Sequence, residues 1–186
     1  SITLFGTLFF DLEFALLAGM ITSFFFYMER TSKPNIATLG LNEKGRFINK
    51  LRDNGLKECS NLKVIRIDGS LYFGSIEKIE DFISKLYEEN KIQHLLISAE
   101  GINFIDLAAA EWLTNEVVKW QKNRGGIYIT GLKMVSQDVL QKGGFIDKMG
   151  AEIFFKDKKS AISLIHSRMN KPCKEQVFDE CKLKID

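Results

Sequence analysis

The residue types that most often bind metals or carry catalysis are few in this chain. The two histidines, His94 and His166, have no Cys or carboxylate at metal-ligand spacing. The three cysteines, Cys59, Cys173 and Cys181, form neither a C-x-x-C pair nor a zinc-type arrangement with histidine. The sequence therefore predicts no metal site.

Glycine-rich phosphate loops and nucleophile motifs are missing from the sequence as well. It has no G-x-G-x-x-G after a strand, no G-x-x-x-x-G-K-[ST] and no G-x-S-x-G. The Gly125-Gly126 and Gly143-Gly144 pairs lack the Lys and Ser or Thr that hold phosphates and magnesium, so they are interpreted as turns. We therefore expect no enzyme, no catalytic residue and no cofactor. An α/β enzyme remains a third hypothesis, which measurable binding of a nucleotide or metal would support.

One junction has the chemistry of a helix start. Phe104-Ile105-Asp106 leads directly into Leu107-Ala108-Ala109-Ala110, and Asp106 is predicted to cap the helix by accepting a backbone N–H two or three residues on. Beyond the cap, free N–H groups, a partial positive charge and small alanine side chains offer a place for an anion or a close-packed partner. A well-capped helix against a neighbouring loop explains the same residues, and both interpretations stay open.

Alternating strand and helix periodicities must position this junction. Strands are predicted at 62–67, 71–73, 92–98, 127–130 and 153–155, with an edge strand at 36–41 and a turn at Asp68-Gly69. Helices are predicted after an N-cap at Ser75 and at about 107–122, 134–142 and 158–168. Trp112 and Trp120 share the apolar face of the second helix and are predicted to lie in the core. The order predicts an α/β fold with a mixed, mostly parallel sheet and about four helices.

The composition is uneven along the chain. The 186 residues carry a net charge of +2, which is too small for a protein built around a large basic nucleic-acid face. Seven of the 15 Phe lie within the first 26 residues, and the first 28 residues contain only two charges, Asp11 and Glu13. Residues 12–28 are therefore predicted to form one transmembrane helix, with Tyr27 at its interfacial end.

The charges that follow predict the orientation of this helix. Arg30 and Lys33 come after it and no Lys or Arg precedes it, so residues after about 30 are expected on the cytoplasmic side of the cell (inner) membrane. An odd number of cysteines on that side indicates reduced thiols. A signal peptide fits poorly, because a basic start and a small-residue cleavage site are missing. A buried core helix of a soluble domain remains an alternative.

Several strings, taken in order, resemble one family. The apolar segment headed by Phe10-Asp11-Leu12 is followed by Ser-Lys-Pro and then, at 66–74, by Arg-Ile-Asp-Gly-Ser-Leu-Tyr-Phe-Gly. Asn-Phe-Ile-Asp at 103–106 and Val-Phe-Asp-Glu-Cys at 177–181 fit the same pattern. Over residues 7–182 the chain resembles the C-terminal end of a bacterial SulP (sulfate permease) anion transporter.

The resemblance implies a domain organisation. Residues 1–30 would be the C-terminal part of a transmembrane domain, 31–60 a linker with the first strand, and 61–186 the core and tail of a STAS domain. The STAS fold is shared with anti-sigma-factor antagonists. In SulP transporters this domain lies on the cytoplasmic side, with the transport domain of the same polypeptide as partner in a dimeric assembly. The transport-site residues of that family lie on earlier membrane helices, outside these 186 residues.

The resemblance also bears on the Asp106 junction. In anti-sigma-factor antagonists a serine within Asp-Ser-Ser-Gly is phosphorylated by a partner kinase. Asp106 matches the Asp, Leu107 and Ala108 occupy the two Ser positions, and Ala109 occupies the Gly position. The phosphoacceptor position is thus held by Ala108, and we expect no phosphoacceptor. Asp106, Leu107, Ala108 and Ala109 are instead predicted to form a regulatory or partner surface.

Two functions follow from the resemblance. The leading hypothesis is a cytoplasmic STAS regulatory and assembly domain of a SulP-type secondary transporter for sulfate or a related inorganic or organic anion. It implies a homodimeric transporter, leaves room for a cytoplasmic protein partner, and involves no nucleic acid. The alternative is a stand-alone, membrane-anchored STAS-type interaction module that resembles anti-sigma-factor antagonists. Nothing in the sequence selects the transported anion.

Overall fold

The computed structural model describes residues 12–31, 34–42, 46–52, 56 and 59–169. The chain divides into two compact units, residues 1–33 and 34–186. The strings at 177–181, together with Cys173 and Cys181, lie outside the described residues. Each unit is considered by itself below.

The described residues of the first unit form helix α2 (Leu12–Thr31), which covers the segment predicted to be helical. Its large apolar side chains are mostly exposed, from Phe14 to Tyr27. The Thr22 hydroxyl forms its hydrogen bond within the helix, where Oγ1 donates to the Ala18 carbonyl oxygen at 2.7 Å. Among the residues that the structure describes, no helix combines the length and apolar character needed to cross a membrane.

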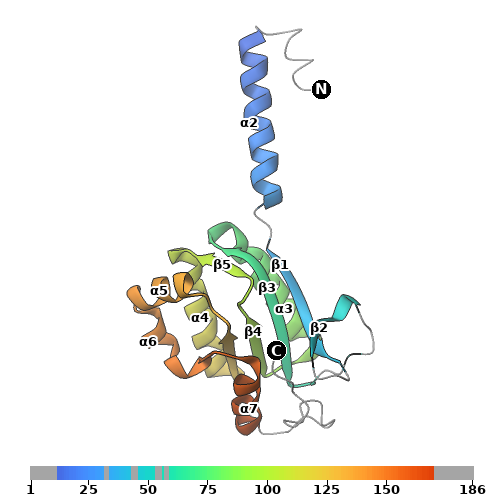
Figure 1. Ribbon diagram of the computed structural model, residues 1–186, viewed down its shortest axis with the longest axis vertical. Helices are drawn as coiled ribbons and strands as arrows, with labels where there is room; N and C mark the ends of the chain where they lie inside the picture. Colours follow the sequence, from blue (N-terminus) through green and yellow to red (C-terminus); the bar gives the residue numbers. More distant parts are fainter. Residues whose placement is uncertain (1–11, 32–33, 43–45, 53–55, 57–58, 170–186) are drawn as a thin grey trace. The chain divides into compact units, whose positions relative to one another are not determined.

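The second unit is built on one mixed sheet, in the order β2-β1-β3-β4-β6-β7 (Figure 1). β1 (Asn35–Leu41) runs antiparallel to both β2 (Phe47–Asn49) and β3 (Leu62–Leu71). β3, β4 (His94–Ser98), β6 (Gly126–Thr130) and β7 (Phe154–Phe155) pair in parallel. β5 (Ile102–Ile105) lies off this path and pairs in parallel with the end of β3. The mixed, mostly parallel sheet predicted from the sequence is confirmed.

Helices cover both faces of this sheet. They are α3 (Phe73–Asn90), α4 (Leu107–Asn123), α5 (Met134–Lys142), α6 (Phe145–Met149) and α7 (Lys158–Arg168), with two short 3-10 helices, η1 (Lys50–Arg52) and η2 (Ala151–Ile153). α3 and α4 lie on one face and α7 lies on the other (Figure 1). All side chains of β4 and β6 are consequently buried. Trp120 is fully buried and Trp112 packs against the core, as predicted.

The described part of the second unit has five α-helices, where the sequence predicted about four. The additional helix, α6, follows Gly143-Gly144, which the sequence suggested as the end of helical structure. Gly144 takes a φ of 67°, a conformation that costs glycine little, and the chain turns there and resumes a helix of five residues. A helix this short presents too few turns for its apolar spacing to be recognised.

The predicted turn at Asp68-Gly69 is wrong, because β3 continues through it. Gly69 has a φ of 124°, and the pairing with β5 shifts register between Gly69 and Leu71. Its N–H donates to the Gly101 carbonyl oxygen at 2.9 Å. A side chain at Gly101 would collide with the Asp68 carboxylate, so the two segments approach as closely as they do because that position is glycine.

The start of α3 also differs from the prediction of an N-cap at Ser75. The N-cap is Tyr72, three residues earlier, so the helix begins at Phe73 and Ser75 is its third residue. The Ser75 hydroxyl accepts the Tyr72 N–H at 3.0 Å and donates to the Tyr72 carbonyl oxygen at 2.8 Å. Serine therefore still closes the helix start, but from inside the first turn.

Cys59 lies buried shortly before β3 and is disulfide-bonded. The expectation of reduced thiols is therefore wrong for this residue. An odd number of cysteines does not exclude a disulfide, because three cysteines can form one disulfide and leave one thiol.

Candidate functional site

Asp106 follows β5 and is the N-cap of α4. Its backbone is extended, with φ −85° and ψ 172°, and its Oδ1 accepts the Ala109 N–H at 2.7 Å. The main-chain carbonyl of Asp106 accepts the Ala110 N–H at 2.9 Å, which is the first bond of the helix. The predicted cap is confirmed, and it places a carboxylate against the positive end of the helix dipole.

The second carboxylate oxygen of Asp106 holds another helix start. Oδ2 accepts the N–H of Phe73, the first residue of α3, at 3.0 Å. The N–H of Asp106 in turn donates to the Leu71 carbonyl oxygen at 2.9 Å. The Asp106 carboxylate thus joins the starts of α3 and α4 through charge-assisted hydrogen bonds, and its main-chain N–H ties this junction to the end of β3. Spacing in the sequence gave no indication of this second contact.

Large apolar side chains stand exposed around Asp106. We call them the carboxyl-edge patch, because they lie on β5 and on the first turns of α3, α4 and α5, all at the carboxyl ends of the parallel strands. Its members and their exposed fractions are Phe73 (76%), Phe104 (44%), Leu107 (65%), Met134 (78%) and Val135 (63%). Single exposed apolar residues are common, but a group on adjoining segments is typical of a partner-binding surface.

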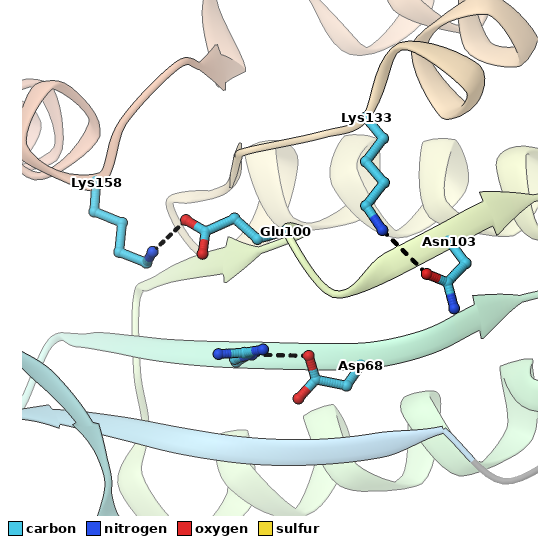
Figure 2. A network of polar contacts seen from close by, with 6 residues as sticks. Asp68, Glu100, Asn103, Lys133 and Lys158 are labelled. Carbon is cyan, nitrogen blue, oxygen red and sulfur yellow. Dashed lines mark hydrogen bonds and ion pairs between the residues drawn. The ribbon is translucent and has the colours of Figure 1, made fainter. Parts of the chain in front are cut away.

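Polar contacts lie within β3 and between the segments around β5 (Figure 2). The bonded pairs are Lys133 Nζ with Asn103 Oδ1 at 3.0 Å, Lys158 Nζ with Glu100 Oε1 at 2.5 Å, and Arg66 Nε with Asp68 Oδ1 at 2.8 Å. The first pair links the start of α5 to β5, and the second links the start of α7 to the loop before β5. Contacts this exposed add little to stability, so their contribution is to position the segments.

The structure separates the four predicted surface residues. Leu107 and Ala108 are exposed, and Asp106 is half-buried with its carboxylate engaged in capping. Ala109 is fully buried and lies outside the exposed surface. The other members of the patch, among them Phe73 and Met134, were missed by sequence reasoning. A signal existed for Met134 and Val135, because two consecutive large apolar residues at the start of a helix cannot both lie on one buried face.

His94 belongs to the core of the described domain. His94 is buried at the start of β4, and its Nδ1 lies 3.4 Å from the Tyr128 hydroxyl. Burial, and secondarily the positive charge of Arg168, lowers the pKa of His94 below its ordinary value. Among the described residues, no three His, Cys, Asp or Glu side chains gather as a metal site would require.

Comparison with known proteins identifies the fold. Residues 55–161, more than half of the chain, match the STAS domain. The chain belongs to the STAS domain family. Its STAS domain is homologous to those of sulfate transporters of the SulP family, and none of the comparisons indicates an enzyme family.

Two curated relatives and one solved structure illustrate the similarity of this STAS chain. The putative sulfate transporter YvdB of Bacillus subtilis (strain 168) is 26% identical over 149 residues, which cover 80% of this chain and 26% of the relative. The probable sulfate transporter 4.2 of Arabidopsis thaliana is 25% identical over 185 residues, 92% of this chain and 27% of the relative. The murine Solute Carrier 26 family member A9 anion transporter has a TM-score of 0.72 at 17% identity, over 89% of this chain and 28% of that one. The chain thus spans about a quarter of the length of these relatives.

Proposed function

We propose that this STAS domain is the cytoplasmic regulatory and assembly domain of a SulP-type secondary anion transporter. The observation that carries the proposal is the carboxyl-edge patch, a group of exposed apolar side chains set around Asp106 on three helix starts. A domain whose polar cap is fully engaged while its neighbouring apolar side chains are exposed is suited to docking rather than to chemistry.

The partner that we propose for the patch is the transport domain of the same polypeptide, within a homodimeric transporter. Homology to sulfate transporters about four times as long as the matched segment supports this choice. The apolar helix α2, which comes directly before the STAS unit in the chain, supports it as well.

For α2 we propose that residues 12–28 are the last membrane helix of the transporter. The support is the nearly charge-free sequence of this segment and the exposure of its apolar side chains. Arg30 and Lys33 follow it, and by the positive-inside tendency they would hold the STAS unit on the cytoplasmic side of the cell membrane.

This regulatory role would not use phosphorylation of the kind known in anti-sigma-factor antagonists. Ala108 occupies the phosphoacceptor position and has no hydroxyl group. Because Ala108 is exposed and small, it would let a partner approach the backbone of the first helical turn.

Anion uptake by the full-length transporter, with and without residues 60–186, tests the proposal. We expect the truncation to reduce uptake or dimer assembly. A finer test is Ala108→Trp, which should weaken docking and leave the domain folded, whereas Ala151→Trp, a matched change at an exposed alanine in η2, should have no effect. Unchanged uptake, stability and assembly after truncation would refute the regulatory role.

The membrane assignment has its own test. The 186-residue chain should remain in the membrane fraction during alkaline carbonate extraction, and replacing Leu17 and Ile21 with Asp should release it. Complete extraction of the unaltered chain would contradict a spanning helix. The open reading frame upstream of Ser1 separates a transporter, which needs several hundred preceding residues, from a stand-alone anchored module.

A further inference from the structure

Cys59 carries a disulfide in a domain that we propose to be cytoplasmic. Its side chain is buried, at 1% exposed, and is disulfide-bonded. Thiol systems of the cytoplasm keep most cysteines reduced, so a disulfide there is typically a transient, redox-sensing one. We infer that Cys59 forms a reversible disulfide with Cys173 and that this bond is a redox switch at the end of α7. The inference rests on the proposed function only for the cytoplasmic location of the domain.

Cys59 lies at the amino ends of the parallel strands. It comes three residues before Leu62, where β3 begins. Between the two, the Asn61 carbonyl oxygen accepts the N–H groups of Gln93 and His94 at 3.1 and 2.9 Å, where β4 begins. The backbone next to Cys59 is therefore bonded to the start of β4 as well as leading into β3.

Helix α7 ends on the same side of the sheet. Its first residue, Lys158, is paired with Glu100, beyond the carboxyl end of β4. Its last residue, Arg168, acts at the other end of β4, where burial and the Arg168 charge lower the pKa of His94. The chain therefore leaves α7 at the amino end of β4, which is the end where Cys59 lies.

Chain length selects Cys173 as the partner. The chain has three cysteines, so a bond within it joins Cys59 to Cys173 or to Cys181, both of which lie outside the described residues. Met169 is buried in the same core cluster as Cys59, and Cys173 follows it by four residues, a reach of up to about 14 Å. This reach covers the Cα–Cα distance of about 4.4–6.8 Å that a disulfide requires. Cys181 follows by twelve residues, so bringing it to Cys59 costs more chain entropy.

Formation of the bond is a two-electron oxidation, and the oxidant is a low-molecular-weight disulfide. The Cys173 thiolate attacks one sulfur of this disulfide, forms a mixed disulfide and releases one thiolate. The Cys59 thiolate then attacks the Cys173 sulfur and releases the second thiolate. The two protons lost by the cysteines are taken up by the two released thiolates, so one external disulfide is reduced to two thiols. Cys59 acts second because its buried side chain is closed to an external disulfide.

The bond constrains α7 and the unfolded chain together. It ties the segment after α7 to the segment before β3, and so closes a loop of more than about 100 residues. Reduction removes this tie, while the apolar contacts of Ala161, Ile162 and Ile165 with the sheet remain. The reduced chain should therefore unfold more readily, and the last turn of α7 should open more often.

A redox titration of the detergent-solubilised 186-residue chain tests the inference. The chain is equilibrated with reduced and oxidised glutathione at a series of ratios, quenched with acid, unfolded and alkylated, and its mass is measured. We expect three alkylated thiols at the large excess of reduced glutathione typical of the cytoplasm. Where oxidised glutathione dominates, we expect one disulfide, which peptide mapping should assign to Cys59 and Cys173.

Matched serine variants identify the bond and its effect. Cys173→Ser should abolish the disulfide, and Cys181→Ser, the control, should keep it. Reduction should raise the unfolding equilibrium constant in urea about thirtyfold or more in the unaltered chain and in Cys181→Ser. It should leave the constant of Cys173→Ser unchanged. Hydrogen exchange of the last turn of α7 should follow the same pattern.

Three outcomes would overturn the inference. A disulfide that survives every glutathione ratio is a permanent structural bond and no switch, and three free thiols at every ratio exclude the bond. A Cys59 disulfide that still forms in Cys173→Ser refutes the partner. All three outcomes are distinguishable from failure of the proposed function, because that function is tested by anion uptake and docking through the carboxyl-edge patch.

Discussion

The two ends of the sheet treat large apolar side chains in opposite ways. At the amino end, Trp120 is fully buried and meets Tyr87 edge to face, with ring centroids 6.1 Å apart. The guanidinium of Arg124 covers both rings, 3.4 Å from the Tyr87 centroid and 4.9 Å from that of Trp120. At the carboxyl end, Phe73 and Leu107 are left open to solvent.

The same two helices produce both arrangements, since α3 and α4 begin at the carboxyl end and finish at the amino end. Their last turns pack against each other through Tyr87 and Trp120, and the guanidinium of Arg124 covers both rings. Such a cation–π interaction contributes about 0.5–2 kcal/mol, depending on how far the cation is desolvated. Their first turns are capped by one carboxylate and carry apolar side chains outward. The domain therefore covers large apolar side chains at one end of these helices and leaves those at the other end, such as Phe73 and Leu107, available for a partner.

The largest expected effect comes from opening the covered end. Trp120→Ala should lower the free energy of unfolding by about 3–5 kcal/mol, because the indole is fully buried and its loss leaves a cavity. Urea unfolding followed by circular dichroism measures the change. A loss below about 1 kcal/mol would show that the amino end is not the firmly packed end.

A smaller effect is expected at the junction of the two helix starts. Asp106→Ala should cost about 1–2 kcal/mol, because it removes the acceptor of two backbone N–H groups. Asp157→Ala is the control for the loss of one helix cap, since Asp157 caps α7 alone, where its carboxylate accepts the N–H and the hydroxyl of Ser160. Equal losses in the two variants would contradict the idea that Asp106 holds two helices.

The amino end should also be sensitive to acid through His94. Burial and Arg168 lower the pKa of His94 in the folded chain, so below about pH 6.5 the unfolded chain binds the proton more readily. Stability should therefore hold above that pH and fall as the pH drops toward the lower folded value. Stability measured from pH 8 to 5 should show this slope, and His94→Gln should flatten it. An unchanged slope in the variant would rule out His94 as its source.

The smallest effect on stability is expected at the carboxyl-edge patch. Leu107→Ser and Met134→Ser should each change the free energy of unfolding by less than about 0.5 kcal/mol, because both side chains are exposed. Urea unfolding of the 186-residue chain measures this. A loss above about 1.5 kcal/mol would mean that the patch belongs to the core, and the contrast between the two ends would fail.

Periodicity predicted most of the elements because the apolar residues of each long helix and buried strand are spaced according to the face that the element buries. The helices at 134–142 and 158–168 lie where their apolar spacing placed them, and the Asp106 cap was predicted from residue type and position. Local patterns could not show that β5 leaves the main path to pair with β3, because that choice depends on Gly69 and Gly101 meeting across 32 residues.

The patch was only partly predictable for the same reason. Leu107 and Ala108 were predicted from the helix-start junction and from the resemblance, but the exposure of Phe73 depends on what lies across from it. Its spacing of three from Ile76 would continue the buried stripe of α3. The position of an apolar residue in a sequence gives its helical face, and only the packed neighbours decide whether that face is covered at the very first turn.

The two hydrogen bonds of the Asp106 carboxylate have a mechanical consequence. A load applied at Leu107 cannot move the start of α4 alone, because Oδ2 also holds Phe73 and Oδ1 holds Ala109. The carboxylate binds both helix starts, so the first turns of α3 and α4 shift together unless one of its two hydrogen bonds breaks. A pull on the outer face of the domain would then be delivered along both helices to the end where Arg124 covers the aromatic pair.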